Sequence, residues 1–186
     1  RPALFQALVS TGELLRPVLP QAFTAHLPRQ IAASGQRPAV QHARRVLMLE
    51  GCVQRSLSPN TNAATARVLD RLGISITPIA QAGCCGAVDY HLNAQDTGLD
   101  RARRNIDAWW PAVEAGAEAI VQTASGCGAF VKEYAYLLRD DPAYAAKAER
   151  ISALARDIVE VIRAEPLERF EACCDQTLAF HCPCTL

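Results

Sequence analysis

The stretch Ile74-Ser75-Ile76-Thr77-Pro78-Ile79 is a short apolar run that predicts a buried β-strand, and it leads through a short loop to Gly83-Cys84-Cys85-Gly86. A strand followed by a cysteine is also predicted on both sides of this stretch. These flanking units are residues 46–49 before Cys52 and residues 118–123 before Cys127. If the strands run parallel in one sheet, the four thiols meet beyond one edge of that sheet.

The segments between these strands have the residue spacing of helices. One helix is predicted over 58–72, with Ser58 as its cap and Gly73 as its end. A second is predicted over 99–113, kinked or restarted at Pro111. Alternating strands and helices predict an α/β fold, a parallel sheet with flanking helices on both faces.

The C-terminal part of the chain continues this alternation. Three more elements are predicted: a short helix over about 129–138, a helix from Asp141 whose apolar stripe includes Ile151 and Ile162, and a strand over 178–180. Cys182 follows this last strand as Cys52 follows the first, at an offset of 130 residues. This correspondence hints at an internal repeat.

Composition restricts the classes of function. The chain has 186 residues, of which 50% are hydrophobic and 20% charged, with 19 basic and 19 acidic side chains. This is the composition of a soluble globular domain without a nucleic-acid-binding surface. No apolar run reaches the roughly 20 residues that span a bilayer. With no sign of secretion, the eight cysteines favour metal or cluster binding over a disulfide scaffold.

Four convergent thiolates are the ligand set of an iron–sulfur cluster or of a zinc ion. Both members of an adjacent pair, Cys84 and Cys85, reach a cluster more easily than a single zinc, because a cluster spreads several irons over a few ångström. Glycines on both sides of the pair and of Cys127 let backbone approach a ligand closely. The alternatives are buried cysteines that act as small hydrophobic residues, or a disulfide between two of them.

The other polar candidates have simpler interpretations. Cys173-Cys174 is interpreted as a surface turn, whereas Cys182 is expected to bind a metal with partners further along the chain. Arg101, Arg103 and Arg104 are expected on a solvated helix face, with i,i+4 ion pairs to Asp100 and Asp107. No Walker motif, G-x-G-x-x-G fingerprint or nucleophile elbow is present, so the sequence shows no site for chemistry on an organic substrate.

The cysteine segments resemble a known family, the cysteine-rich CCG domain. The matching segments are Glu50-Gly51-Cys52, Gly83-Cys84-Cys85-Gly86-Ala87, Ala124-Ser125-Gly126-Cys127-Gly128 and His181-Cys182-Pro183-Cys184-Thr185-Leu186. Such domains occur in heterodisulfide reductase, lactate-utilisation, anaerobic glycerol-3-phosphate dehydrogenase and glycolate oxidase subunits. Residues 89–95 and 105–111 resemble the glycolate oxidase iron–sulfur subunits in particular. The fuller family pattern ends in C-x-x-C, and Ala124 stands in place of its first cysteine.

The resemblance also implies a domain organisation. Residues 1–42 would be a helical, proline-rich connector from a ferredoxin-like domain that carries two [4Fe–4S] clusters. Residues 43–172 would be the first CCG unit, and residues 173–186 the start of a second, truncated unit.

The implied function is that of an iron–sulfur electron-transfer subunit in a glycolate (2-hydroxy acid) oxidase or dehydrogenase complex. FAD-containing subunits would oxidise the substrate, and electrons would pass on to quinone or another acceptor. Cys52, Cys84, Cys85 and Cys127 would hold a [4Fe–4S] cluster, with zinc as the alternative. The implied location is the cytoplasm, with peripheral association at the inner face of the membrane through the complex. Two other functions are a redox-silent zinc-binding docking domain and a heterodisulfide-reductase-like thiol–disulfide subunit.

Overall fold

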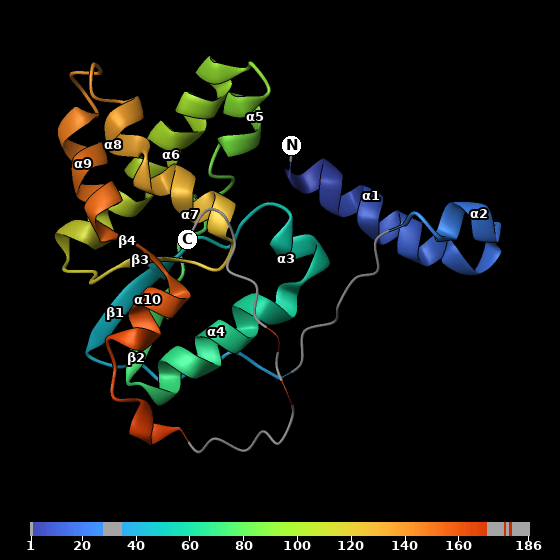
Figure 1. The fold of residues 1–186 in the computed structure, drawn as a ribbon, viewed down its shortest axis with the longest axis horizontal. Helices are drawn as coiled ribbons and strands as arrows, with labels where there is room; N and C mark the ends of the chain where they lie inside the picture. The colour runs from blue at the N-terminus through green and yellow to red at the C-terminus, as the bar shows by residue number, and fades with distance from the viewer. Residues whose placement is uncertain (1, 28–34, 171–176, 178, 180–186) are drawn as a thin grey trace.

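The computed structural model of this chain describes residues 2–27, 35–170, 177 and 179 (Figure 1). Its centre is a four-stranded sheet in the order β2-β1-β3-β4, and every neighbouring pair is parallel. The strands are β1 (Arg44–Met48), β2 (Ile74–Thr77), β3 (Ile120–Gln122) and β4 (Ala155–Asp157). Leu47 aligns with Thr77 of β2 on one side and with Ile120 of β3 on the other. The predicted α/β fold with a parallel sheet is confirmed.

Helices cover both faces of the sheet. The described helices of the α/β unit are α3 (Gln54–Leu57), α4 (Pro59–Arg71), α5 (Ala87–His91), α6 (Gln95–Glu114), α7 (Ser125–Lys132), α8 (Tyr134–Leu137), α9 (Ala145–Leu154), α10 (Ile158–Arg163) and the 3₁₀ turn η2 (Leu167–Arg169). Helices α6, α7, α8 and α9 pack on one face around Trp109, Ile120 and Phe130. Helices α4 and α10 pack on the other face around Leu69 and Val121.

The alternation of side chains along the strands explains these two cores. Leu47 and Ile120 enter the core beneath α6, whereas Val46 and Val121 enter the core beneath α4. Successive residues of a strand point to opposite faces, so a parallel sheet that is buried on both faces has continuous apolar strands.

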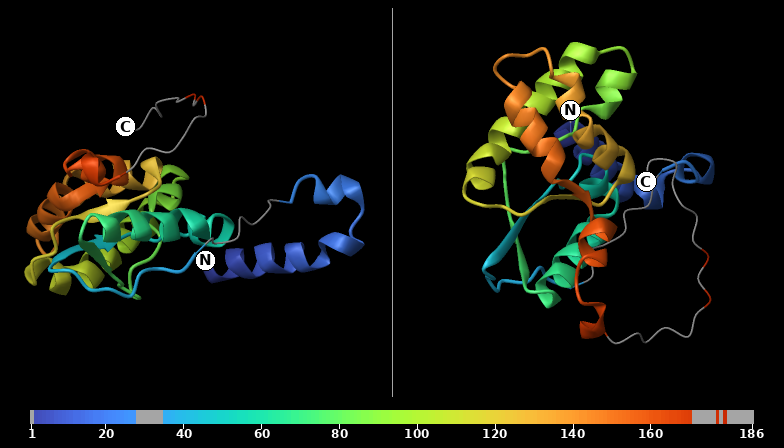
Figure 2. Two further views of the ribbon diagram at one scale, coloured as in Figure 1. Left: turned by 90° about the horizontal axis from the view of Figure 1, so that it is seen from below. Right: turned by 60° about the vertical axis from the view of Figure 1, so that its left-hand side comes forward.

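The N-terminal segment extends away from this unit (Figure 2). It contains α1 (Pro2–Leu15), the 3₁₀ turn η1 (Arg16–Val18) and α2 (Gln21–Thr24). Several of its apolar side chains are exposed, including Leu8, Leu14 and Phe23. No helix of the described residues is both long enough and apolar enough to cross a membrane.

One predicted helix is wrong. The apolar stripe that includes Ile151 and Ile162 is not on one helix, because α9 ends at Leu154 and the chain forms β4 before α10 begins. Ile151 packs on the α6 side of the sheet and Ile162 on the α4 side, so the chain has to cross the sheet between them. It crosses as an edge strand paired with β3. Asp157 and Glu160 then start α10 with a capping box.

Other boundaries differ less. Helix α4 begins after Ser58 and ends before Gly73 (φ +75°), as predicted. The predicted side-chain cap by Ser58 does not form, because its hydroxyl pairs with the hydroxyl of Thr61 at 2.9 Å. Helix α6 continues through Pro111 to Glu114 without a restart. The helix predicted over 129–138 is two helices, and the first begins at Ser125. The strand predicted over 178–180 falls outside the described residues except for Ala179, and Cys173, Cys174, Cys182 and Cys184 lie outside them entirely.

Candidate metal centre

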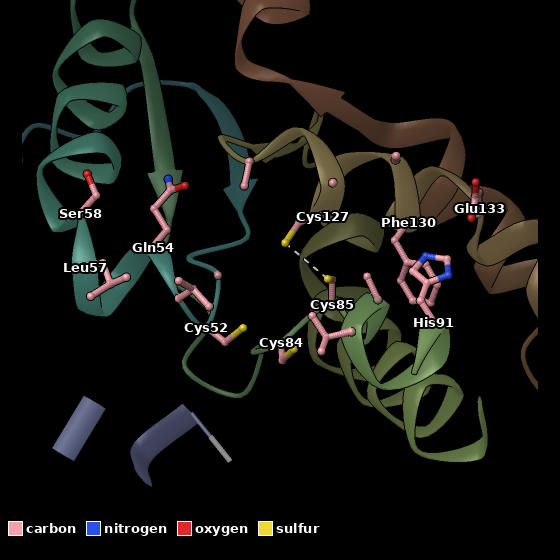
Figure 3. Close-up of a pocket in the computed structure, with 17 residues that line it drawn as sticks. Cys52, Gln54, Leu57, Ser58, Cys84, Cys85, His91, Cys127, Phe130 and Glu133 are labelled. Atoms are coloured by element: carbon pink, nitrogen blue, oxygen red, sulfur yellow. Dashed lines mark hydrogen bonds between the residues drawn. The ribbon is translucent and has the colours of Figure 1, made fainter. Parts of the chain in front are cut away.

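The four predicted ligand cysteines come together beyond the carboxyl ends of three strands (Figure 3). Cys52 follows β1, Cys84 and Cys85 follow β2, and Cys127 follows β3. Strand β2 pairs with one side of β1, and the next strand along the chain, β3, pairs with the other side. The strand order therefore reverses at β1. Crevices of this kind are where open parallel sheets bind their ligands.

Each thiol also lies at the start of a helix. Cys52 precedes α3, the tandem pair precedes α5, and Cys127 occupies the first turn of α7. The first N–H groups of a helix have no partner inside the helix and favour negative charge. The backbone amide of Gly86 lowers the pKa of Cys84, and the backbone amide of Ala87 acts in the same direction on Cys85. These two backbone amides therefore favour the thiolate forms of the tandem cysteines.

Gly86 is required by the close contact of α5 with α6. Its φ is +102°, and a Cβ on this residue would lie 2.5 Å from the carbonyl oxygen of Gly98. Glycine alone accepts both this backbone conformation and this approach. The glycine that follows the tandem pair thus turns the chain into α5 while α6 passes directly beneath it.

The thiols line an open cavity of about 700 Å³. Cys84 and Cys85 are buried, and Cys52 and Cys127 are half-buried. The rest of the lining is mostly apolar, with Val53, Leu57, Val88 and Phe130 around the sulfurs and with His91 and Glu133 also among its residues. No three His, Cys, Asp or Glu side chains of the described part of the chain converge tightly enough to hold one metal ion.

Hydrogen bonds between the sulfurs divide the thiols into two classes. A hydrogen bond from Cys52 is the main cause that lowers the pKa of Cys84, and the charge of Arg101 lowers it further. The Sγ of Cys85 donates to the Sγ of Cys127 at 3.4 Å, which lowers the pKa of Cys127. The same bonds, together with burial, raise the pKa of Cys52 and of Cys85. Without a metal, these bonds favour the thiolate form of Cys84 and Cys127 and the thiol form of Cys52 and Cys85, and a bound metal displaces the remaining protons.

The predicted solvated arginine face is wrong in part. Arg103 pairs with Asp100 and Asp141, and its predicted bond to Asp107 does not form. Arg101 pairs with Asp89 and lies against Cys84 in a second cavity. Arg104 donates to the carbonyl oxygen of Cys84 at 3.4 Å. Two of the three arginines therefore face the tandem cysteines.

A buried polar network holds the Cys52 loop and was missed by the sequence analysis. The side chain of Asn62 donates to the backbone carbonyl and to the carboxylate of Glu50, at 2.9 and 3.0 Å. Its Oδ1 accepts from Gln54 and from Thr123. Since Glu50, Gln54 and Thr123 belong to three different loops and helices, this network ties the end of β1 to the end of β3.

A family comparison agrees with this geometry. Residues 46–132 match the cysteine-rich domain described as CCG. The chain carries a CCG domain. The matched range contains Cys52, Cys84, Cys85 and Cys127, the four thiols that the sheet brings together. Ala124 lines the same cavity as the four thiols, so a methyl group occupies the place of the additional cysteine of the fuller pattern.

Curated relatives match this chain over more residues than the range 46–132 of the CCG domain. The glycolate oxidase iron–sulfur subunit of Escherichia coli K12 is 66% identical over 186 residues, which is 100% of this chain and 46% of that protein. The probable glycolate oxidase iron–sulfur subunit of Bacillus subtilis is 31% identical over 82% of this chain and 33% of that protein. Lactate utilization protein A of Bacillus licheniformis is 26% identical over 72% of this chain and 54% of that protein.

The chain thus spans about half of the length of the curated relatives it matches, or less. No solved structure gives a significant match.

Proposed function

We propose that Cys52, Cys84, Cys85 and Cys127 hold a [4Fe–4S] cluster and that the chain carries electrons in a glycolate (2-hydroxy acid) oxidase complex. The observation that carries the proposal is the convergence of four thiols at the strand-order reversal, with two of them already favoured as thiolates. The names of the Escherichia coli and Bacillus subtilis relatives support the type of complex.

The local chemistry supports a cluster. Iron–sulfur clusters take thiolate ligands, and their potentials depend on charge, solvent exposure and hydrogen bonds to sulfur. The cavity supplies apolar walls, backbone amides and the nearby charge of Arg101. Such a cluster supplies one-electron transfer, while the protein around Cys84 and Cys85 sets the potential at which it occurs.

The proposal includes the rest of the complex. FAD-containing subunits would oxidise the 2-hydroxy acid, and quinone or another acceptor would receive the electrons. Residues 43–172 would form the first CCG unit, residues 1–42 a connector and residues 173–186 the start of a second unit, in which Cys182 binds a metal. The complex would work in the cytoplasm at the inner face of the membrane.

A second candidate rests on the distance of 3.4 Å between the sulfurs of Cys85 and Cys127. Two thiols this close suit thiol–disulfide exchange. They would become a disulfide while an external disulfide takes up their two electrons and two protons and leaves as two thiols.

The test compares Cys85→Ser with Cys173→Ser in the full-length protein purified without oxygen. We expect Cys85→Ser to lose about four irons and their visible absorption, whereas Cys173→Ser keeps both. Equal iron loss in the two variants contradicts the ligand assignment. Unchanged iron in Cys85→Ser, together with lost reduction of a small disulfide, favours the second candidate.

A further inference from the structure

Two fully buried polar residues hold the backbone of the tandem cysteines from behind. Asn105 on α6 and Tyr134 on α8 are both 0% exposed. The hydroxyl of Tyr134 donates to the carbonyl oxygen of Cys85 at 2.6 Å. The amide group of Asn105 donates to the carbonyl oxygen of Cys84 at 3.0 Å and accepts from the backbone N–H of Gly83 at 2.9 Å. Asn105 also donates to the hydroxyl of Tyr134 at 3.3 Å, so the two side chains form one unit.

This unit fixes the direction in which peptide groups face the sulfurs. In a trans peptide, the C=O and the next N–H lie in one plane and point in opposite directions. Because Tyr134 holds the carbonyl of Cys85, the N–H of Gly86 points to the other side of the peptide, and this N–H lowers the pKa of Cys84. Glycine permits many backbone conformations, so the Cys85–Gly86 peptide could rotate without this restraint.

We propose that Asn105 and Tyr134 are positioning residues that hold the Cys84 and Cys85 peptides with their carbonyls away from the sulfurs, and so raise the reduction potential of a bound cluster. This inference rests on the proposed function. An N–H that donates to a ligand sulfur stabilises the additional negative charge of the reduced state. A carbonyl turned toward the same sulfur would oppose reduction.

The test uses Tyr134→Phe, which removes the hydroxyl and keeps the ring that packs edge-on against Phe130. The matched control is Tyr144→Phe, whose hydroxyl donates to the exposed Asp107 rather than to the cysteine loop. Both are measured in the full-length protein by iron content, by redox titration and by hydrogen exchange of residues 83–87. Asn105→Ser is a second variant, for use if Tyr134→Phe does not fold. It removes the side-chain amide that donates to the carbonyl oxygen of Cys84.

We expect Tyr134→Phe to keep its iron and to have a more negative midpoint potential. At the midpoint of the unmodified protein, its ratio of reduced to oxidised cluster falls by up to about tenfold, which is about 59 mV for a one-electron couple. Asn105→Ser shifts the potential in the same direction, and Tyr144→Phe does not shift it. Lower thermal stability with an unchanged potential overturns the proposal, because Tyr134 is then only structural.

Zinc in place of iron in every sample overturns the proposed function. Hydrogen exchange then tests whether Tyr134 restrains the Cys85–Gly86 peptide. Faster exchange at Gly86 in Tyr134→Phe than in Tyr144→Phe then supports the restraint on this peptide. Equal exchange overturns it.

Discussion

Replacement of Gly86 by alanine tests the packing that presents the tandem cysteines. Gly86 has φ +102°, and its added Cβ would lie 2.5 Å from the carbonyl oxygen and 3.3 Å from the Cα of Gly98. The left-handed conformation costs an L-residue about 1–2 kcal/mol. Displacing the backbone of α6 adds about 1–3 kcal/mol, the usual cost of overpacking. We therefore expect Gly86→Ala to lower the free energy of unfolding by about 2–5 kcal/mol.

The matched control is Gly73→Ala at the end of α4. Gly73 has φ +75°, and a Cβ there would meet nothing within 4 Å, so only the cost of about 1–2 kcal/mol for the conformation applies. The assay is thermal unfolding of both variants, where 1 kcal/mol corresponds to about 2–4 °C at this chain length. Gly86→Ala should also lose metal while Gly73→Ala keeps it. Equal shifts in Tm for the two variants, with metal retained in both, would refute the reasoning.

Two further predictions concern protonation and the chain crossing at the sheet edge. In metal-free protein the lowered pKa values of Cys84 and Cys127 mean that the unfolded chain binds more protons below about pH 8.5, so stability rises with pH up to that value. Above this pH, the raised pKa values of Cys52 and Cys85 mean that the folded chain binds more protons, so stability falls as pH rises. The free energy of unfolding, measured with urea across pH 6–11, should therefore have a maximum near pH ~8.5. A variant with all four cysteines changed to serine should lack this maximum. Asp157→Ala removes the cap of α10 and should cost about 1 kcal/mol in urea unfolding, whereas the exposed Asp140→Ala should cost almost nothing; equal costs would count against the capping role.

The sheet and the meeting of the thiols were predictable because they follow from local patterns. Strands β1, β2 and β3 contain short apolar runs, each of which precedes a cysteine loop, and parallel pairing brings these three loops to one edge. The division between α9, β4 and α10 was not predictable in this way. The apolar spacing of Ile151 and Ile162 is compatible with one helix, and only the sheet shows that the two residues belong to opposite cores.

The ligands were likewise easier to predict than their support. Cysteine and glycine have a recognisable chemistry, whereas Asn105 and Tyr134 act on Cys84 and Cys85 through contacts 21 and 49 residues apart in sequence. One signal was available. Asn105 lies between Ala102 and Trp109 on the apolar stripe of α6, and a polar residue on a buried stripe needs a hydrogen-bond partner.

The most direct measurement is the content of iron, acid-labile sulfide and zinc in this 186-residue chain purified without oxygen. The account predicts about four irons and four sulfides per chain, with a signal that changes on reduction. One zinc per chain without sulfide would contradict it, because Cys52, Cys84, Cys85 and Cys127 would then hold a structural ion that carries no electrons.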